Sequence, residues 1–249
     1  MRQPKNVEPA PFNDDPIAVA RRNSIDYSIK VTYKEAIEGT AKRQVRVYAD
    51  GVYDMFHSGH AKQLMQAKLS FHENTDVYLI VGMNGDQETH LLKGKTVMNE
   101  EERYETVRHC RYVDEVFRNG PFYPDEEFMK VNKIDFIAHD EAPYPYANGK
   151  GDAYDWVKKK GMFLATKRTE HVSTTDVITR IINDYDAYLL RNIRRGCSNS
   201  ELGVSYVKEQ QVKAMAAASL VLDHWENRSR EFVNHFIGIV TFNFLLINN

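Results

Sequence analysis

The sequence predicts an α/β fold in which an open parallel sheet of about five strands carries helices on both faces, followed by a C-terminal amphipathic helical segment. The main observation is that short apolar runs alternate with stretches of helical periodicity from residue 44 onward. A second observation is that helical composition returns from Val207, after an interruption rich in Gly, Ser and Asn. This alternation favours a Rossmann-like sheet. The apolar runs are Val45 to Ala49, Val77 to Val81, Val113 to Phe117, Phe136 to Ala138 and Met162 to Ala165.

The bulk composition fits one large domain with tails. The chain has 249 residues, of which 42% are hydrophobic and 27% are charged, and this is enough to build one sizeable core. The formal net charge of -2 gives no support to nucleic-acid binding. Cys110 and Cys197 fit neither a disulfide framework nor a zinc cluster, which indicates a reduced intracellular compartment.

The two ends differ in composition from the middle of the chain. We expect residues 1–40 to form a mostly flexible tail that folds over the domain near its end, because Pro, Asn, Asp and Arg are frequent there and periodicity is weak before Ile29. We expect no secretory signal at the start, which lacks an apolar h-region. The longest apolar run, 236–247, is too short to span a bilayer. The main domain is therefore predicted over residues 41–195, and a linker with a helical segment over residues 196–249.

The first apolar run leads into a turn and then into two histidines three residues apart. The predicted strand ends in a turn at Asp50-Gly51, and the tetrad His-Ser-Gly-His at 57–60 opens a predicted helix. Ligands of open α/β sheets collect at the carboxyl ends of the strands, where helix N-termini attract phosphates. Because His57 and His60 share one helical face, both can reach the same phosphate chain of a nucleotide triphosphate.

Two alternatives to this phosphate site remain open. The histidines could be ordinary surface or core residues at the start of a helix. They could also bind a metal ion, although the pair lacks a third ligand at a recognisable spacing.

The second run is followed by a lysine and then by a well-punctuated helix. Lys93 comes after the second strand and its loop, at the same edge of the sheet as the histidines, where it could contact a phosphate or be an ordinary solvated charge. In the helix, Asn99 is the predicted cap and Glu102 occupies the third helical position. Its apolar spacing makes Cys110 a predicted core residue.

A second candidate phosphate site precedes the last helix of the main domain. Ser173 followed by Asp176 is an N-cap pattern, and apolar residues then repeat along one helical face. This helix start is rich in hydroxyl groups and is preceded by Arg168, which favours phosphate binding. The alternative is a well-capped helix with a surface arginine.

Several motifs together resemble those of the cytidylyltransferase family, and in particular its choline-phosphate branch. The resemblance covers roughly residues 40–195 in one collinear run, which makes coincidence improbable. The family motifs are His57 to His60, Arg103-Tyr104, Arg111 to Val116, Arg168 to Glu170 and Val172 to Thr175. The segments similar to the choline-phosphate branch are Tyr48 to His60, Val97 to Glu100 and Ala138 to Asp140.

The resemblance implies transfer of the cytidylyl group from CTP to phosphocholine, giving CDP-choline and pyrophosphate, on a catalytic domain over residues 41–195. Mg²⁺ would accompany CTP without an assigned protein ligand. The implied catalytic residues are His57, His60, Lys93 and Arg168. The implied nucleotide-binding residues are Val52, Tyr53, His57, His60, Lys93, His139, Arg168, Thr169, Glu170, Ser173 and Thr174. The implied phosphocholine-binding residues are Lys93, Phe122, Asp140, Tyr144 and Tyr154.

Two positions depart from the family pattern. His171 stands where the family has glycine, and a positive φ at that glycine would make the histidine cost on the order of one to a few kcal/mol in strain. Phe122 stands where the choline-phosphate branch uses tryptophan, so a weaker π-face would meet the quaternary ammonium. Aromatic residues in such numbers are also common in ordinary packing.

The C-terminal segment resembles part of the membrane-binding helix of the choline-phosphate enzymes. Leu222, Trp225, Phe232, Phe236 and Ile239 alternate with charged residues, as in an interfacial helix, although the same helix could pack on the catalytic domain or a dimer partner. The net charge of this segment is near zero, so we expect weak peripheral membrane binding. The resemblance further implies a homodimer and a cytoplasmic location, with the endoplasmic reticulum membrane and the nucleus as alternatives.

Two other functions stay open beside choline-phosphate cytidylyl transfer. The first is the ethanolamine-phosphate reaction, which is disfavoured because that relative carries two catalytic domains and this chain has room for one. The second is a low-activity, membrane-sensing or dimer-modulating partner of an active enzyme, which His171 and the unusual C-terminal sequence motivate.

Overall fold

The computed structural model describes residues 8–147 and 149–247, and within them the sheet confirms the predicted α/β fold. Its strands lie in the order β3-β2-β1-β4-β5, and every neighbouring pair is parallel. The order changes direction between β1 and β4, which is the point where ligands collect in open α/β sheets. The strands are β1 (Val45–Gly51), β2 (Val77–Met83), β3 (Glu115–Arg118), β4 (Phe136–Asp140) and β5 (Phe163–Thr166).

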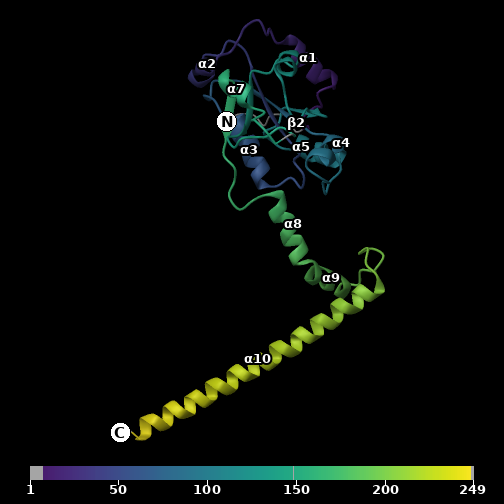
Figure 1. Ribbon diagram of the computed structural model, residues 1–249, viewed down its shortest axis with the longest axis vertical. Coiled ribbons are helices and arrows are strands. Elements are labelled where there is room, and N and C mark those ends of the chain that lie inside the picture. Colours follow the sequence, from purple (N-terminus) through teal and green to yellow (C-terminus); the bar gives the residue numbers. More distant parts are fainter. Residues whose placement is uncertain (1–7, 148, 248–249) are drawn as a thin grey trace. The chain divides into compact units, whose positions relative to one another are not determined.

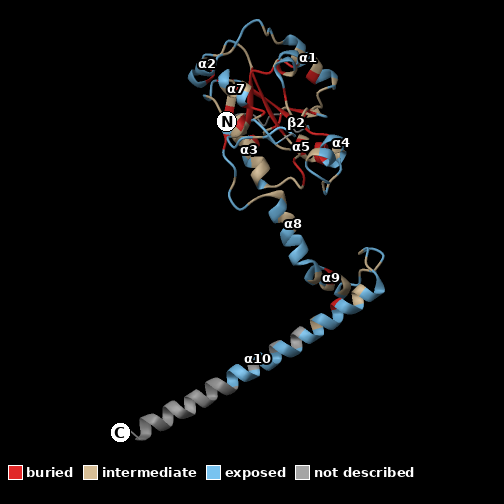
Figure 2. Ribbon diagram, viewed as in Figure 1, coloured by how far each residue is buried: buried red, intermediate tan, exposed pale blue. Residues whose placement is uncertain are grey.

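The central strand β1 and its neighbour β2 contribute side chains to a hydrophobic core on each face of the sheet. Val47 and Leu79 belong to the first core, whereas their chain neighbours Tyr48 and Ile80 belong to the second. Because both faces are covered, β1 and β2 are buried along almost their whole length. Figure 2 shows the buried residues gathered on these strands.

Helices cover both faces, as predicted (Figure 1). The first core contains Ala36, Leu64 and Val107, which come from α2, α3 and α5, and the second contains Met129 and Val157, which come from α6 and α7. The bounds of the helices in this part are α2 (Tyr33–Glu38), α3 (Ser58–Lys68), α4 (Asp86–Leu92), α5 (Glu100–Arg108), α6 (Glu126–Val131) and α7 (Asp155–Lys159).

The predicted cap of the helix over 100–108 is confirmed. The Asn99 side chain accepts a hydrogen bond from the Glu102 backbone N–H at 3.0 Å, and the Glu102 carboxylate accepts one from the Asn99 N–H at 2.9 Å. This reciprocal pair satisfies donors that a helix start otherwise leaves free. Cys110 lies just past the helix end and is half-buried against the first core.

Residues 8–40 have more helix than the mostly flexible tail that we expected, although the end of the segment packs on the domain as predicted, and the first seven positions lie outside the described residues. The segment contains α1 (Pro16–Ser24) and α2, whose Ala36 is fully buried. Phe12 forms an isolated parallel bridge with Val116 of β3. The physical reason for the difference is tertiary packing, because a few apolar residues dock on the sheet although the segment itself has little periodicity.

The chain divides into two compact units, one ending at Val177 and one beginning at Ile178, whereas we predicted a boundary after residue 195. α8 (Thr174–Asn183) spans this division, and α9 (Tyr185–Arg194) and α10 (Tyr206–Ile247) follow it. α9 packs on α10, and the Lys208 ammonium of α10 lies 2.7 Å from the Asp186 carboxylate of α9. These contacts explain why α9 belongs to the second unit.

α10 is a single long helix through the predicted C-terminal segment (Figure 1). Leu222 and Trp225 are each 69% exposed. The side chains of the other predicted landmarks, Phe232, Phe236 and Ile239, lie outside the described part. None of the described helices combines the length and the apolar character that a membrane crossing requires.

Candidate active site

The loop after β1 has an unusual backbone that two buried contacts hold in place. Tyr53 and Met55 both adopt positive φ, at 55° and 49°, a region that non-glycine residues seldom occupy. Tyr53 is 3% exposed, so its packing compensates for the backbone strain. Val52 is anchored through its carbonyl, which accepts a hydrogen bond from Arg103 Nη1 at 2.6 Å. The predicted nucleotide-binding residues Val52 and Tyr53 therefore lie in a fixed loop.

Arg103 joins the carboxyl ends of β1 and β2 from a fully buried position. Its Nη2 donates to the Asn84 carbonyl at 2.9 Å and to Asp86 Oδ1 at 2.7 Å, in addition to the bond from Nη1 to the loop after β1. A planar guanidinium can reach three acceptors at fixed angles, which a lysine cannot do. Arg103 therefore sets the spacing of the two strand ends on which the candidate site is built.

The two predicted histidines cap α3 by hydrogen bonding through their rings. His57 is the residue just before the helix, and its Nδ1 accepts from the Gly59 N–H at 3.1 Å. His60 Nδ1 accepts from the His57 backbone N–H at 3.4 Å. The rings stack with their centroids 3.8 Å apart. The structure thus brings both histidines to the same helix start.

These hydrogen bonds determine which ring nitrogen carries the proton. Burial lowers the pKa of His57, and burial together with the neighbouring His57 lowers the pKa of His60 to about 4. Both imidazoles are therefore neutral near pH 7, and since Nδ1 accepts, the proton lies on Nε2. His57 Nε2 is buried and has no hydrogen-bond partner among the described residues. Such a donor is prepared for an acceptor atom that the protein itself does not supply.

Asp54 connects the α3 start to two distant segments. Its carboxylate accepts hydrogen bonds from the backbone N–H groups of Val97 at 2.8 Å and Met98 at 2.9 Å. Its carbonyl accepts from the Thr174 hydroxyl at 3.1 Å. The side chain is 8% exposed, so these bonds are shielded from water. Asp54 thereby holds the loop before α5 and the start of α8 against the loop after β1.

Gly59 allows the segment before α8, where the second phosphate site is predicted, to pack closely against the start of α3. A Cβ at this position would lie 3.3 Å from the Val172 carbonyl oxygen and 2.9 Å from the His57 ring. A side chain here would therefore displace either the segment before α8 or the histidine. The two helix starts that the sequence singled out lie side by side.

The start of α8 has the predicted cap. Ser173 Oγ accepts from the Asp176 N–H at 3.1 Å and donates to the Asp176 carboxylate at 2.6 Å. Ser173 and Thr174 are half-buried, as is Thr169, whereas Glu170 is exposed. The capping hydroxyl is therefore engaged, and the remaining backbone N–H groups of this turn are the donors available for an anion.

Arg168 is held less firmly than the histidines. Its side chain is 77% exposed, and its Nε lies 3.9 Å from Asp140 Oδ2. At such exposure an ion pair contributes little stability. Arg168 can therefore change its rotamer when an anion binds.

His171, which stands where the family has glycine, adopts a positive φ. Its φ is 58°, in the left-handed region where glycine is free of strain. The side chain is exposed, so no packing explains the histidine. The backbone strain is about 1 kcal/mol, since His visits this region more readily than most residues.

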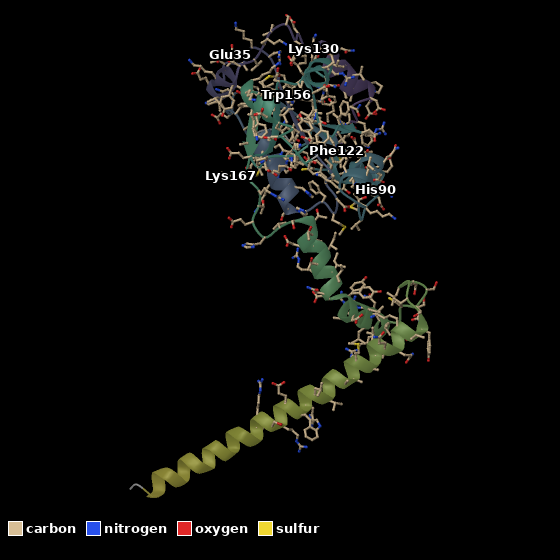
Figure 3. The ribbon with its side chains drawn as sticks, viewed as in Figure 1. Glu35, His90, Phe122, Lys130, Trp156 and Lys167 are labelled. Atoms are coloured by element: carbon tan, nitrogen blue, oxygen red, sulfur yellow. The ribbon has the colours of Figure 1, made fainter. Side chains whose placement is uncertain are left out.

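Lys93 lies among the predicted phosphocholine-binding residues. Its Nζ is 5.5 Å from the centre of the Phe122 ring and 5.1 Å from that of Tyr144, within range of a cation–π contact. The residue is exposed overall, yet desolvation lowers the pKa of the ammonium, and Asp50, Tyr123 and Asp140 oppose that shift. Phe122, labelled in Figure 3, is 2% exposed. The aromatic faces therefore already attract one cation.

Tyr154 and His139 complete the aromatic group at the ends of β1 and β4. Their ring centroids are 4.5 Å apart, and Tyr144 lies 5.5 Å from His139 and 5.9 Å from Tyr154. The Tyr154 hydroxyl donates to Asp50 Oδ2 at 2.7 Å. Asp140 follows His139 at the end of β4 and accepts from the Ala142 N–H at 3.1 Å. The structure thus groups the predicted phosphocholine-binding residues around Lys93.

Asp50 is a charged residue of this group that the sequence prediction did not select. It is 6% exposed, and burial raises the pKa of its carboxyl, while His139, Tyr154 and Lys93 oppose the shift. Its Oδ1 has no hydrogen-bond partner in the described part of the chain. We interpreted Asp50-Gly51 as the turn that ends the strand, whereas β1 continues to Gly51. A buried position for an aspartate cannot be recognised before its partner Tyr154 is known.

A fold with this strand order and two adjacent helix starts at the carboxyl ends of β1 and β5 is that of a nucleotidyltransferase. The sequence model of the cytidylyltransferase-like family matches residues 48–180, about half of the chain. The chain belongs to the cytidylyltransferase-like family.

Curated relatives agree with this assignment. The chain is 51% identical over 208 residues to the choline-phosphate cytidylyltransferase A of Rattus norvegicus, covering 82% of this chain and 54% of that protein. It is 45% identical over 219 residues to the choline-phosphate cytidylyltransferase 2 of Arabidopsis thaliana, covering 80% and 71%. The ethanolamine-phosphate cytidylyltransferase of Dictyostelium discoideum is more distant, at 43% over 143 residues, covering 57% and 38%. The chain spans about half the length of the rat relative that it matches.

Proposed function

We propose that this chain transfers the cytidylyl group of CTP to phosphocholine, forming CDP-choline and pyrophosphate. The observation that supports this proposal most directly is the buried Nε2 of His57, a donor without a protein partner at the start of α3, beside the start of α8. Two adjacent helix N-termini offer backbone N–H groups and a partial positive charge to a polyphosphate. The activity for which the choline-phosphate relatives are named agrees with this chemistry.

In the proposed reaction an oxygen of the phosphocholine phosphate attacks the α-phosphorus of CTP in line with the bond to pyrophosphate. One P–O bond forms as the other breaks, and pyrophosphate leaves with the bonding electron pair. His57 and His60 act as neutral hydrogen-bond donors through Nε2. They therefore stabilise negative charge on the phosphates without forming a permanent salt bridge to one substrate. Lys93 and Arg168 supply the positive charges that bring two anions together.

The phosphocholine end of the site is assigned to the aromatic group around Lys93. A quaternary ammonium donates no hydrogen bonds, so a protein selects it with aromatic faces and carboxylates. Phe122, Tyr144 and Tyr154 offer the faces, and Asp140 offers a carboxylate near them. Burial and the Asp50 charge raise the pKa of Tyr144 to about 12, so this ring stays neutral and keeps its hydroxyl proton.

Mg²⁺ is assigned to the phosphate oxygens of CTP. The described residues contain no group of three His, Cys, Asp or Glu side chains that could hold a metal ion. Mg²⁺ commonly binds substrate phosphates with few protein ligands, and the proposal is that it enters the site together with the nucleotide. It would offset phosphate charge, and no protein residue is assigned to it.

Homodimerisation, weak membrane binding through α10 and the cytoplasmic location stay predictions. Leu222 and Trp225 are exposed on α10, as an interfacial helix requires, although an exposed face can also bind protein. The low-activity modulator is the second candidate, and the strained backbone at His171 favours it.

Isotope-labelled phosphocholine and phosphoethanolamine, each supplied with CTP and Mg²⁺, test the proposal. We expect labelled CDP-choline in excess over labelled CDP-ethanolamine, and lipid vesicles added to parallel reactions measure membrane dependence. A preference for phosphoethanolamine would overturn the substrate assignment. Product from neither substrate, with or without vesicles, would contradict the enzyme and favour the modulator.

A further inference from the structure

We propose that Asp152 is a positioning residue that fixes Tyr144 relative to Tyr154 and thereby sets the affinity for phosphocholine. This inference rests on the proposed function, because it assigns a role within the phosphocholine end of the same site. The residue lies in the loop between β4 and α7 and was not among the residues selected from the sequence.

A single carboxylate oxygen of Asp152 holds both ends of this loop. Oδ1 accepts hydrogen bonds from the backbone N–H groups of Tyr144 and Tyr154, each at 3.1 Å. The Tyr144 carbonyl in turn accepts from the Ala153 N–H at 2.8 Å. The other carboxylate oxygen, Oδ2, lies 2.8 Å from Lys158 Nζ on α7. Asp152 therefore connects both tyrosines and the adjacent helix.

The two tyrosines differ in how firmly the rest of the protein holds them. Tyr154 is fully buried in the second core, and its hydroxyl is bonded to Asp50. Tyr144 is only half-buried and begins a loop whose next described residues, 145–147, are exposed. Gly149 and Gly151 further along the loop adopt positive φ, at 72° and 77°. Asp152 transfers the fixed position of Tyr154 to Tyr144, which the loop alone would leave mobile.

The charge of Asp152 strengthens the connection. Burial opposes ionisation, but the hydrogen bond from Lys158 and those from the two tyrosine amides outweigh it and lower the pKa of this carboxyl. The side chain is thus an anion near pH 7. Hydrogen bonds to an ionised acceptor are shorter and about twice as strong as neutral ones.

The position of the Tyr144 ring matters because the quaternary ammonium of phosphocholine must contact the ring faces of both Tyr144 and Tyr154. The Tyr144 and Tyr154 ring centroids are 5.9 Å apart, and the angle between the two rings is 48°. Attraction between a cation and a ring requires the cation to lie within about 6 Å of the ring centre. The ammonium is remote from the reacting phosphate, so losing one face weakens ground state and transition state equally.

The steady-state kinetics of the full chain carrying Asp152→Ala test the inference. We expect the phosphocholine KM to rise about tenfold, which corresponds to a loss of about 1.4 kcal/mol in binding free energy. The kcat and the CTP KM should stay within about twofold of the unaltered chain. Asp152→Asn keeps an Oδ1 acceptor for both amides and should restore most of the phosphocholine affinity. Asp155→Ala is the matched control, because it removes an exposed Asp–Lys pair nearby, and its KM values should not change.

Amide hydrogen exchange makes a failure of this inference distinguishable from a failure of the proposed function. In the Asp152→Ala variant the Tyr144 and Tyr154 amides should exchange faster than in the unaltered chain, whether or not turnover is measurable. An unaltered chain that makes no CDP-choline contradicts the proposed function. Faster exchange in the variant would still establish the connection itself.

Three outcomes would overturn the inference in an active enzyme. These are an unchanged phosphocholine KM, an equal rise in both KM values, and unaltered exchange of the two amides. If Asp152→Ala does not fold, Lys158→Met provides the test, since it removes the ion pair and keeps the carboxylate. A selective rise of about threefold in the phosphocholine KM supports the inference, and a rise for CTP as well contradicts it.

Discussion

The starts of α3 and α8 are both candidate phosphate sites, yet they are built very differently. At α3 the rings of His57 and His60 stack, cap the helix and are half-buried. At α8 the capping Ser173 bonds to its own turn, Arg168 is 77% exposed and His171 has a strained backbone. The two starts are joined by the Thr174 hydroxyl bond to Asp54.

This difference indicates that one half of the site is rigid before a nucleotide arrives and the other half adapts to it. A rigid donor stabilises a transition state without reorganisation, whereas an adaptable arginine loses side-chain entropy when it binds. We therefore expect changes at α3 to affect turnover most and changes at α8 to affect stability or affinity by smaller amounts.

The largest expected effect is on turnover. Replacing His60 with alanine removes a half-buried donor from the rigid half, so kcat should fall on the order of 10³-fold. Initial rates of CDP-choline formation measure this, and circular dichroism checks that the fold persists. The contrast between the rigid start of α3 and the adaptable start of α8 is contradicted if a folded variant keeps its turnover within about tenfold of the unaltered chain.

A smaller effect is expected on stability in acid. Because His60 has an ordinary pKa of 6.5 and a pKa of about 4 when folded, the unfolded chain binds more protons between these values. The free energy of unfolding should then fall as the pH drops from about 6.5 to about 4, with His60 contributing about 3 kcal/mol. Urea unfolding at several pH values measures the slope. In the His60→Gln variant the slope should be shallower, and an identical slope would refute the role of His60.

The smallest effect is expected in the adaptable half. Replacing His171 with glycine removes the left-handed strain and should raise the free energy of unfolding by about 1 kcal/mol, less the extra entropy of an unfolded glycine. Thermal unfolding measures the change. His171→Ala keeps a Cβ at the same φ and should show no gain. Equal stability of the two variants would mean that backbone strain does not explain the effect.

The fold was predictable because its signal is local. Each strand is a short apolar run, and the apolar pattern changes to helical spacing between runs, so all five strands appear within a few residues of their predicted positions. The helices within residues 8–40 were not predictable in this way. Their stability comes from contacts across long sequence separations, such as the bridge from Phe12 to Val116.

The candidate site was predictable only in part. Histidines, lysine and arginine at strand ends carry recognisable chemistry, and the resemblance selected among them. The residues that hold them were missed, because Asp54 and Asp152 act through backbone N–H groups that every residue has. Arg103 belonged to a recognised motif, but its role became visible only when its three acceptors were known.

The strand order has a consequence for how the chain is made. β1 pairs with β2 on one side and with β4 on the other, and β4 begins only at Phe136. A nascent chain that has not yet emerged from the ribosome as far as β4 leaves one edge of the buried strand β1 unpaired. Such an edge invites pairing with other chains until the missing strand arrives. The interval of synthesis between β2 and β4 is therefore when this protein most needs protection by chaperones.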